Sequence, residues 1–209
     1  MNLQYMGSCK NMQRKIKLYT KDYGVFFTSD THYNHGNIIK ALSTWEDLET
    51  AREGFASIEE MNNLIVKNTN EVVGENDVLF HLGDVAFGKD AIIDFRNRIK
   101  CKNLYVILGN HDKEIDRRDN LKQMFSGVYR MCDVYVDDKL IVLCHYAMRT
   151  WKKSHRDSIS LYGHSHGKLK NTSKSMDVGI DTNNFYPYSY DRIMELLPTF
   201  PNHNLVCNF

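Results

Sequence analysis

The chain has 209 residues, enough for one globular domain with a substantial core, and we expect a single domain over 1–209. Its composition is that of an ordinary folded protein, with 42% hydrophobic residues, 25% charged residues and a formal net charge of +1. This balance excludes a disordered chain, a collagen-like chain and a protein dominated by a polyanion-binding tail. The unusual feature is the nine histidines, because histidine is the commonest metal ligand in proteins.

Targeting signals are not recognisable in the sequence. The N-terminal segment has no apolar stretch of signal-peptide length, and no apolar run approaches the roughly 18 residues of a membrane span. The five cysteines lie far apart and form no C-x-x-C pair. We therefore expect a cytoplasmic protein with free thiols and no membrane partner.

Two short strand-like stretches open the chain. Polar and apolar residues alternate over 15–19, and a turn-like segment leads into the apolar run 25–27. This pattern predicts a hairpin over 1–24 at the edge of a sheet. The basic residues of 10–21 fit a solvated edge strand, and contact with nucleic acid is the alternative.

Helices and strands then alternate. A capping-box spacing followed by apolar residues at helical intervals predicts an amphipathic helix over 57–73, and a second helix is expected over 90–99. Short apolar strands are expected at 78–82 and 104–108. This alternation predicts an α/β layered fold.

The pattern changes after residue 132, where apolar stretches are joined by short polar turns. We expect a mostly antiparallel second half that ends in a helix over 189–197. Its predicted strands are 134–136, 140–144, 158–162 and 176–180.

Metal-competent side chains follow five of the predicted strands. Since open α/β sheets place their sites at the carboxyl ends of strands, we expect these side chains to converge. Carboxylates and imidazoles without thiolates favour a dinuclear site for borderline divalent metals over a structural zinc site. The five blocks are D-T-H at 30–32, G-D at 83–84, G-N-H-D at 109–112, His145, and G-H-S-H at 163–166.

These blocks resemble the ordered signature D-x-H, G-D, G-N-H-[DE], H and G-H-x-H of the calcineurin-like metallophosphoesterases. The resemblance implies an α/β fold, a two-layered β-sandwich of mixed sheets flanked by helices, and hydrolysis of phosphate esters. It also implies two divalent metal ions, for which Mn is expected first and Fe, Zn or Ni also suit the ligands. By position, one metal is held by Asp30, His32, Asp84 and His166, and the second by Asp84, Asn110, His145 and His164, with Asp84 as the bridge.

His111 takes the position of the family's catalytic histidine. The resemblance implies in-line attack on phosphorus by a metal-bridging hydroxide, while His111 assists the leaving group. Many relatives extend the second block to G-D-x-x-D, and the last aspartate of that block orients this histidine. Phe87 stands at that position here, which leaves Asp112 as the neighbouring candidate for the orienting role.

Two further residues are candidates for substrate contacts. Arg149, four residues beyond His145, is a candidate phosphate clamp because a guanidinium group matches phosphate oxygens; the alternative is a surface arginine. His35 is a candidate contact to the substrate phosphate, with an ordinary loop histidine as the alternative. His81 lies within an apolar strand, which favours a hydrogen-bonded core histidine; the alternative is a hydrogen bond from His81 to a metal ligand. Residues 36–56 are expected to form a wall of the site.

The leading hypothesis for function is a phosphodiesterase whose substrate is a nucleotide or another small phosphodiester. Only 18 residues separate His145 from His164, which leaves little chain for a protein-docking groove. The alternatives are a nuclease on DNA or RNA and a non-catalytic metal-binding scaffold. The sequence leaves the oligomeric state open.

Overall fold

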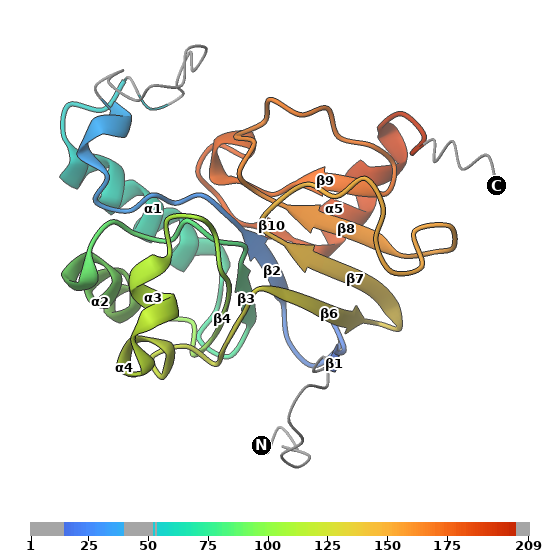
Figure 1. Ribbon diagram of the computed structural model, residues 1–209, viewed down its shortest axis with the longest axis horizontal. Coiled ribbons are helices and arrows are strands. Elements are labelled where there is room, and N and C mark those ends of the chain that lie inside the picture. Colours follow the sequence, from blue (N-terminus) through green and yellow to red (C-terminus); the bar gives the residue numbers. More distant parts are fainter. Residues whose placement is uncertain (1–14, 40–51, 53, 204–209) are drawn as a thin grey trace.

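The computed structural model describes residues 15–39, 52 and 54–203 (Figure 1). Two five-stranded sheets occupy its centre. In the first sheet, β2 to β5 are parallel neighbours and β10 pairs antiparallel with β2. In spatial order this sheet contains β10 (Tyr188–Ser189), β2 (Val25–Thr28), β3 (Val78–His81), β4 (Asn103–Ile107) and β5 (Gly127–Tyr129).

The second sheet contains, in spatial order, β1 (Lys15–Leu18), β6 (Met131–Val136), β7 (Lys139–Cys144), β8 (Ile159–Tyr162) and β9 (Ser175–Asp177). Only β6 and β7 pair antiparallel, and the other neighbours are parallel. The expectation of a mostly antiparallel second half is therefore wrong. The connections over 145–158 and 163–174 are long enough for the crossovers that parallel strands need.

The predicted hairpin around 1–24 is also wrong. β1 pairs with β6 in the second sheet, whereas β2 pairs with β3 and β10 in the first. The physical reason is burial, because Val25 and Phe27 of β2 pack in the core between the sheets and a hairpin partner at a sheet edge offers no such burial. β1 is an edge strand, as expected. Residues 1–14, which include part of the basic segment, lie outside the described residues.

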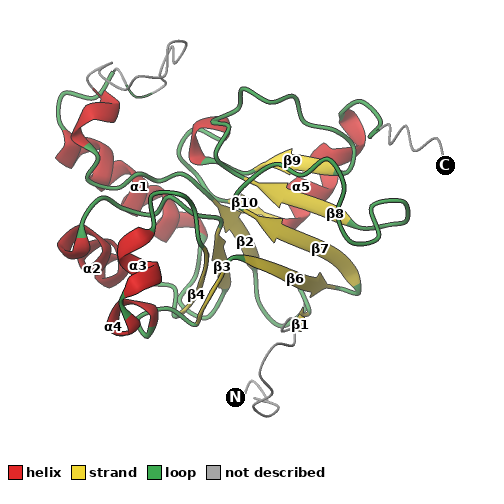
Figure 2. Cartoon of the chain, viewed as in Figure 1, coloured by secondary structure: helices red, strands yellow, loops and turns green. Residues whose placement is uncertain are grey.

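The helices between residues 58 and 122 cover the first sheet on the side away from the second sheet (Figure 2), whereas the helix over 190–196 packs into the core that the two sheets share. The predicted helices over 57–73, 90–99 and 189–197 are confirmed to within about one residue. α3 and α4 were not expected, because such short segments show no helical periodicity. Within the described ranges, no helix is long and apolar enough to cross a membrane. The helices are α1 (Ile58–Val72), α2 (Lys89–Arg98), α3 (Lys113–Arg117), α4 (Asp119–Lys122) and α5 (Tyr190–Leu196), with short 3-10 helices at Gly36–Ile39, Ile180–Thr182 and Leu197–Thr199.

Alternation along the strands of the first sheet builds two cores. Leu79 of β3 faces the helices, and Phe80 faces the second sheet. Phe80 stacks between Phe27 and Tyr105 at ring-centroid distances of 5.5 and 5.2 Å. This packing fixes the register of the parallel strands, so that their carboxyl ends open at a common edge.

Candidate metal centre

The loops that follow β2, β3, β4, β7 and β8 meet at one edge of the sandwich and hydrogen-bond to one another. The N–H of Asp30 donates to the carbonyl of Gly83 at 2.9 Å, and the N–H of Gly163 donates to the carbonyl of His145 at 3.0 Å. All seven predicted ligands stand on these loops. Two clusters of ligand atoms result, which we call the first group and the second group.

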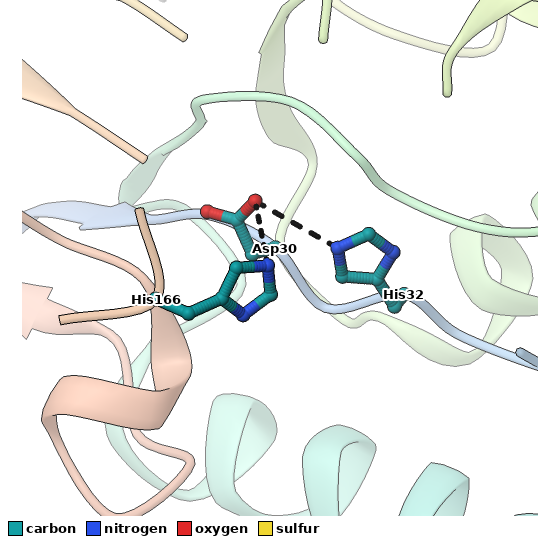
Figure 3. Close-up of side chains that lie close together, drawn as sticks. All are labelled: Asp30, His32 and His166. Carbon is teal, nitrogen blue, oxygen red and sulfur yellow. Dashed lines mark ion pairs between the residues drawn. The ribbon is translucent and has the colours of Figure 1, made fainter. Parts of the chain in front are cut away.

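The first group consists of Asp30, His32 and His166 (Figure 3). Asp30 Oδ1 lies 3.8 Å from His32 Nε2 and 3.7 Å from His166 Nε2. The other carboxylate oxygen, Oδ2, accepts a 2.9 Å hydrogen bond from the N–H of His164. One oxygen of Asp30 is therefore held by the backbone while the other is aimed at two imidazoles.

The second group consists of Asp84, His145 and His164. Asp84 Oδ2 lies 3.5 Å from His145 Nε2. Asn110 Oδ1 lies 3.1 Å from the same nitrogen, so this amide oxygen faces the same point. His145 Nδ1 is 2.7 Å from the carbonyl oxygen of Leu82, which fixes the tautomer that leaves Nε2 available to a metal.

Asp84 faces both groups. Its Oδ2 lies 3.5 Å from His145 Nε2 and 3.7 Å from His32 Nε2 of the first group. Its Oδ1 is held by the backbone N–H of His111 at 2.9 Å. A single carboxylate oxygen that faces the imidazoles of both groups is in a position to bridge two metal ions.

The buried donor atoms fit divalent metals. Asp30 Oδ1, Asp84 Oδ2 and His164 Nδ1 are buried and make no hydrogen bond within the described part of the chain. A buried polar atom without a partner is costly, and an unpaired buried carboxylate especially so. Carboxylate, amide and imidazole donors suit Mn, Fe, Zn and Ni. Two divalent ions would therefore satisfy buried atoms that have no hydrogen-bond partner among the described residues.

The charges at the site also favour the binding of a cation. Burial raises the pKa of Asp30 to about 6. Burial lowers the pKa of His145, but Asp84 and Asp30 outweigh this effect and raise it to about 9. The two aspartates thus favour a proton on the imidazole of His145, a predicted metal ligand. A divalent ion would displace that proton, as metals do when they bind histidine.

The backbone is strained at five of the seven predicted ligands. Left-handed conformations of non-glycine residues cost roughly 1–3 kcal/mol each and cluster at functional sites. Here they occur on three of the loops that carry the predicted ligands. The positive φ angles are 56° at Asp30, 44° at His32, 55° at Asp84, 66° at His164 and 48° at His166.

Two motif glycines allow the loops to approach closely. A Cβ atom on Gly109 would lie 2.2 Å from Asp84 Oδ1. A Cβ atom on Gly163 would lie 2.3 Å from Asp30 Oδ2 and 2.0 Å from Ser29 Oγ. Any larger residue would displace an aspartate of the site.

His111 is exposed beside the two groups. Its ring centroid lies 5.6 Å from that of His32 and 5.0 Å from that of Phe87. Phe87 stacks face to face on His35, with centroids 3.8 Å apart and an interplanar angle of 5°. The residue at the position of the family's orienting aspartate therefore provides a ring contact, which cannot accept a conventional hydrogen bond from His111.

Asp112 does not take the predicted orienting role. Its buried carboxylate accepts hydrogen bonds from the N–H groups of Asp84, Val85 and Gly109 at 2.8 to 2.9 Å. These bonds turn the carboxylate toward the backbone of two ligand-bearing loops. Asp112 holds those loops together, and the expected bond to the His111 ring is not formed.

The two predicted substrate contacts have different settings. His35 is half-buried and stacked at the site, beside the ring of His32 at 5.7 Å. Arg149 is exposed on the loop after β7, and its contact with phosphate stays a prediction. Tyr146, which the sequence did not single out, is exposed with its ring 4.8 Å from that of His164. A single tyrosine after a histidine forms no sequence motif, so no pattern could have identified Tyr146 as a residue of the site.

Sequence reasoning also missed the carboxylates behind the site. Asp177 accepts hydrogen bonds from the N–H groups of Gly167 and Gly179 at 3.0 and 2.8 Å, and Asp181 contacts His166 and Arg52. Asp177 ends β9, so the strand-end rule that found the ligands could have found it. Most of the expected wall, 40–51 and 53, lies outside the described residues.

Comparison with known proteins identifies the family. The model for the calcineurin-like phosphoesterases matches residues 24–177, which include all five motif blocks. The chain belongs to this family, and the observed pair of mixed sheets flanked by helices agrees with its fold. The protein is accordingly a hydrolase acting on phosphoric esters, which sets aside the scaffold alternative.

Individual relatives leave the substrate open. The uncharacterized protein MJ1445 of Methanocaldococcus jannaschii is 28% identical over 182 residues, which cover 83% of this chain and 90% of that protein. The crystal structure of AQ665 from Aquifex aeolicus, a protein of unknown function, matches with a TM-score of 0.60 at 21% identity, covering 83% of this chain and 99% of that one. An archaeal phosphodiesterase matches with a TM-score of 0.43 at 20% identity, covering 75% and 82%, a likeness too weak to carry an argument.

Proposed function

We propose that the protein is a dinuclear-metal phosphodiesterase that acts on a nucleotide or another small phosphodiester. The observation that carries this proposal is the position of Asp84 Oδ2, which faces His145 of the second group and His32 of the first. Mn is the metal we expect, although Fe, Zn and Ni suit the same donors. A cytoplasmic location stays a prediction.

The chain's own residues prepare the site for the reaction. When bound, two divalent ions supply an acidified water molecule and neutralise charge on the phosphoryl oxygens. Asp30 and Asp84 each give one oxygen to a backbone N–H and keep the other for a metal. His145 donates its Nδ1 proton to the Leu82 carbonyl, which keeps Nε2 unprotonated when a metal is bound.

His111 is suited to act on the leaving group. Its N–H donates to Asp84 Oδ1, so its backbone is fixed next to the proposed bridge, while its side chain is exposed. It belongs to neither ligand group. An imidazole in this position can protonate the departing oxygen, a contribution of typically ~10²–10⁴-fold in rate.

The rim of the site supports a small substrate with a negative charge. His35 and Tyr146 stand beside ligands of the two groups, and Arg149 follows on the same loop as Tyr146. Imidazole, phenol and guanidinium groups donate hydrogen bonds to phosphate oxygens. The loop between β7 and β8 has only 14 residues, 145–158, which favours a small ester over a docked protein.

The test is hydrolysis by protein stripped of metal and reconstituted with Mn²⁺. We expect turnover of bis(p-nitrophenyl) phosphate above that of p-nitrophenyl phosphate, and its loss on addition of a chelator. Asp84→Asn should abolish turnover and weaken metal binding together, whereas Asp119→Asn, at an exposed surface pair with Lys122, should change neither. Turnover of the monoester alone would contradict the phosphodiesterase proposal.

The salt dependence of hydrolysis distinguishes a nuclease from a phosphodiesterase that acts on small substrates. Binding of a long nucleic acid releases counterions, so the logarithm of the binding constant falls linearly with the logarithm of the salt concentration. We expect dinucleotides and long DNA or RNA to show the same mild response. Preferential hydrolysis of long strands with a steep salt dependence would favour the nuclease.

A further inference from the structure

A fully buried arginine lies directly behind the first group. Arg52 is 1% exposed, although arginine is almost never fully buried unless it is paired. Its Nε and Nη2 atoms donate to Asp181 Oδ1 and Oδ2, each at 2.7 Å. This is the forked geometry in which a guanidinium group binds a carboxylate with two parallel hydrogen bonds. The pair joins two segments that are 129 positions apart in the sequence.

Asp181, held in place by Arg52, also binds His166, which is a predicted metal ligand. Its Oδ2 accepts a 2.7 Å hydrogen bond from Nδ1 of His166. The Nε2 atom on the other side of the same ring lies 3.7 Å from Asp30 Oδ1. A carboxylate on Nδ1 fixes the tautomer and the plane of the ring, and such partners of metal-binding histidines strengthen the ligand.

The remaining guanidinium protons hold the strand end that carries the other two ligands of the group. Nη2 of Arg52 donates to the carbonyl of Asp30 at 2.6 Å, and Nη1 donates to the carbonyl of Thr31 at 3.1 Å. These carbonyls belong to the two peptide groups that link Asp30 to His32, and both residues have left-handed φ angles, of 56° and 44°. Arg52 therefore contacts, directly or through Asp181, the segments of all three ligands of the first group.

A purely structural role explains these contacts poorly. A buried ion pair adds little net stability, because desolvation of the two charges offsets their attraction. This pair is instead joined at both ends to ligand-bearing segments, and its fork has a shape that lysine lacks.

We propose that Arg52 and Asp181 are positioning residues that set the geometry of the first group for its metal. This inference rests on the metal centre proposed above. It assigns no contact with substrate to either residue. Its consequence is local: loss of the pair weakens the metal of the first group and leaves the metal of the second group in place.

The test measures Mn²⁺ binding without any substrate. Stripped protein is titrated with Mn²⁺ by calorimetry, and the bound metal is followed by electron paramagnetic resonance. The wild-type protein should bind two equivalents with the spectrum of a spin-coupled pair. Arg52→Lys, which keeps the charge, and Asp181→Asn, which keeps the shape, should each weaken one of the two equivalents by about 10–100-fold. Their spectra at one equivalent should be those of an isolated ion.

Asp133→Asn is the matched control. Asp133 on β6 is also a buried carboxylate, 2% exposed, and it pairs with Lys152, which follows His145 on the loop after β7 but belongs to neither ligand group. The control should lower the melting temperature and keep two coupled Mn²⁺ ions. Folded Arg52→Lys or Asp181→Asn with two ions at wild-type affinity would overturn the proposal. If one variant fails to fold, the other decides the question.

The two proposals can fail separately. Wild-type protein that binds no pair of Mn²⁺, Fe²⁺, Zn²⁺ or Ni²⁺ ions would refute the dinuclear centre itself. A wild-type pair with unchanged variants would refute only the positioning role. Equal weakening of both equivalents would also refute it, because the proposed effect is confined to the first group.

Discussion

At the scale of single residues, the site depends on the two carboxylate oxygens of Asp30 and of Asp84 having different partners. Asp30 and Asp84 both accept one backbone hydrogen bond and present the other oxygen to imidazoles at 3.5 to 3.8 Å. The backbone bond removes the rotational freedom of the carboxylate. The oxygen that remains is therefore aimed before a metal arrives, which reduces the entropy lost on binding.

The role of His111 is tested by its removal. His111→Ala should leave both metals bound, because the ring belongs to neither ligand group. Turnover should fall by roughly 10²–10⁴-fold for esters with poor leaving groups and much less for p-nitrophenyl esters, which need no proton. The measurement is kcat/KM across a series of aryl diesters. Equal losses across the series would exclude a general-acid role, and His155→Ala, at an exposed histidine, is the control.

His81 is the hydrogen-bonded core histidine that the sequence favoured. Its Nε2 lies 2.8 Å from Thr31 Oγ1, whose own proton goes to the carbonyl of Val85 at 2.6 Å. Nε2 must therefore be the donor, while Nδ1 accepts from the N–H of Gly83 at 3.3 Å. The ring is neutral in this arrangement, and burial lowers its pKa from 6.5 to about 3.

This shift predicts a pH-dependent stability. Between pH 6.5 and 3 the unfolded chain binds a proton at His81 that the folded chain does not, so acid favours unfolding. The contribution of His81 to the free energy of unfolding falls by about 1.4 kcal/mol per pH unit across this window. His81→Gln cannot titrate at this position, and we expect it to be less stable than the wild-type protein at neutral pH. This difference in the free energy of unfolding should shrink at that rate as the pH falls. Urea unfolding from pH 8 to pH 4 measures it, and a constant difference would contradict the prediction.

At the scale of elements, the ends of parallel strands bring the ligands together. β2, β3 and β4 are adjacent and parallel, and so are β7 and β8, so their following loops open at the same edge. Close contact between these loops needs glycine at the crossing points. The glycines of the motifs therefore serve the approach of the loops as much as the conformation of each loop.

Gly163→Ala tests this requirement. Its methyl group would lie 2.3 Å from Asp30 Oδ2 and would push this carboxylate away from the first group. We expect one Mn²⁺ equivalent to be lost or strongly weakened, with a lower melting temperature. Gly36→Ala is the control, because no atom of the described residues lies within 4 Å of the added Cβ and metal binding should not change. Normal binding of both ions by Gly163→Ala would show that the loops can relax.

At the scale of the whole molecule, the candidate metal groups join the two sheets. The first group takes Asp30 and His32 from the loop after β2 and His166 from the loop after β8. The second group takes Asp84 from the loop after β3, and its histidines follow β7 and β8. Each metal would therefore fasten one sheet of the sandwich to the other.

This arrangement predicts that metal binding stabilises the entire fold. A ligand that binds only the folded state adds about 2.7 kcal/mol per site at a hundred times its dissociation constant. The melting temperature should rise with Mn²⁺ in a single cooperative transition and fall when a chelator is added. Asp84→Asn should show a much smaller rise. Separate melting of two parts, with only one part responding to Mn²⁺, would contradict the clamp between the sheets.

The sequence by itself determined the helices over 57–73 and 90–99, the buried strands and the five motif blocks. These features are local: helical periodicity, apolar runs and the residues that follow them are all visible in short windows. The order of the blocks was enough to indicate the family. The same local information identified Asp30, Asp84 and the histidines as metal-competent, because each follows an apolar strand.

Only the tertiary structure decided which strands pair and what stands behind the ligands. β1 and β2 are close in sequence yet lie in different sheets, because burial of β2 between its neighbours outweighs local pairing. The contact between Arg52 and Asp181 spans 129 positions, and the carboxylate of Asp112 turns to backbone groups of another loop. Such contacts depend on loops closed by distant strands, and no short stretch of sequence contains the information that forms them.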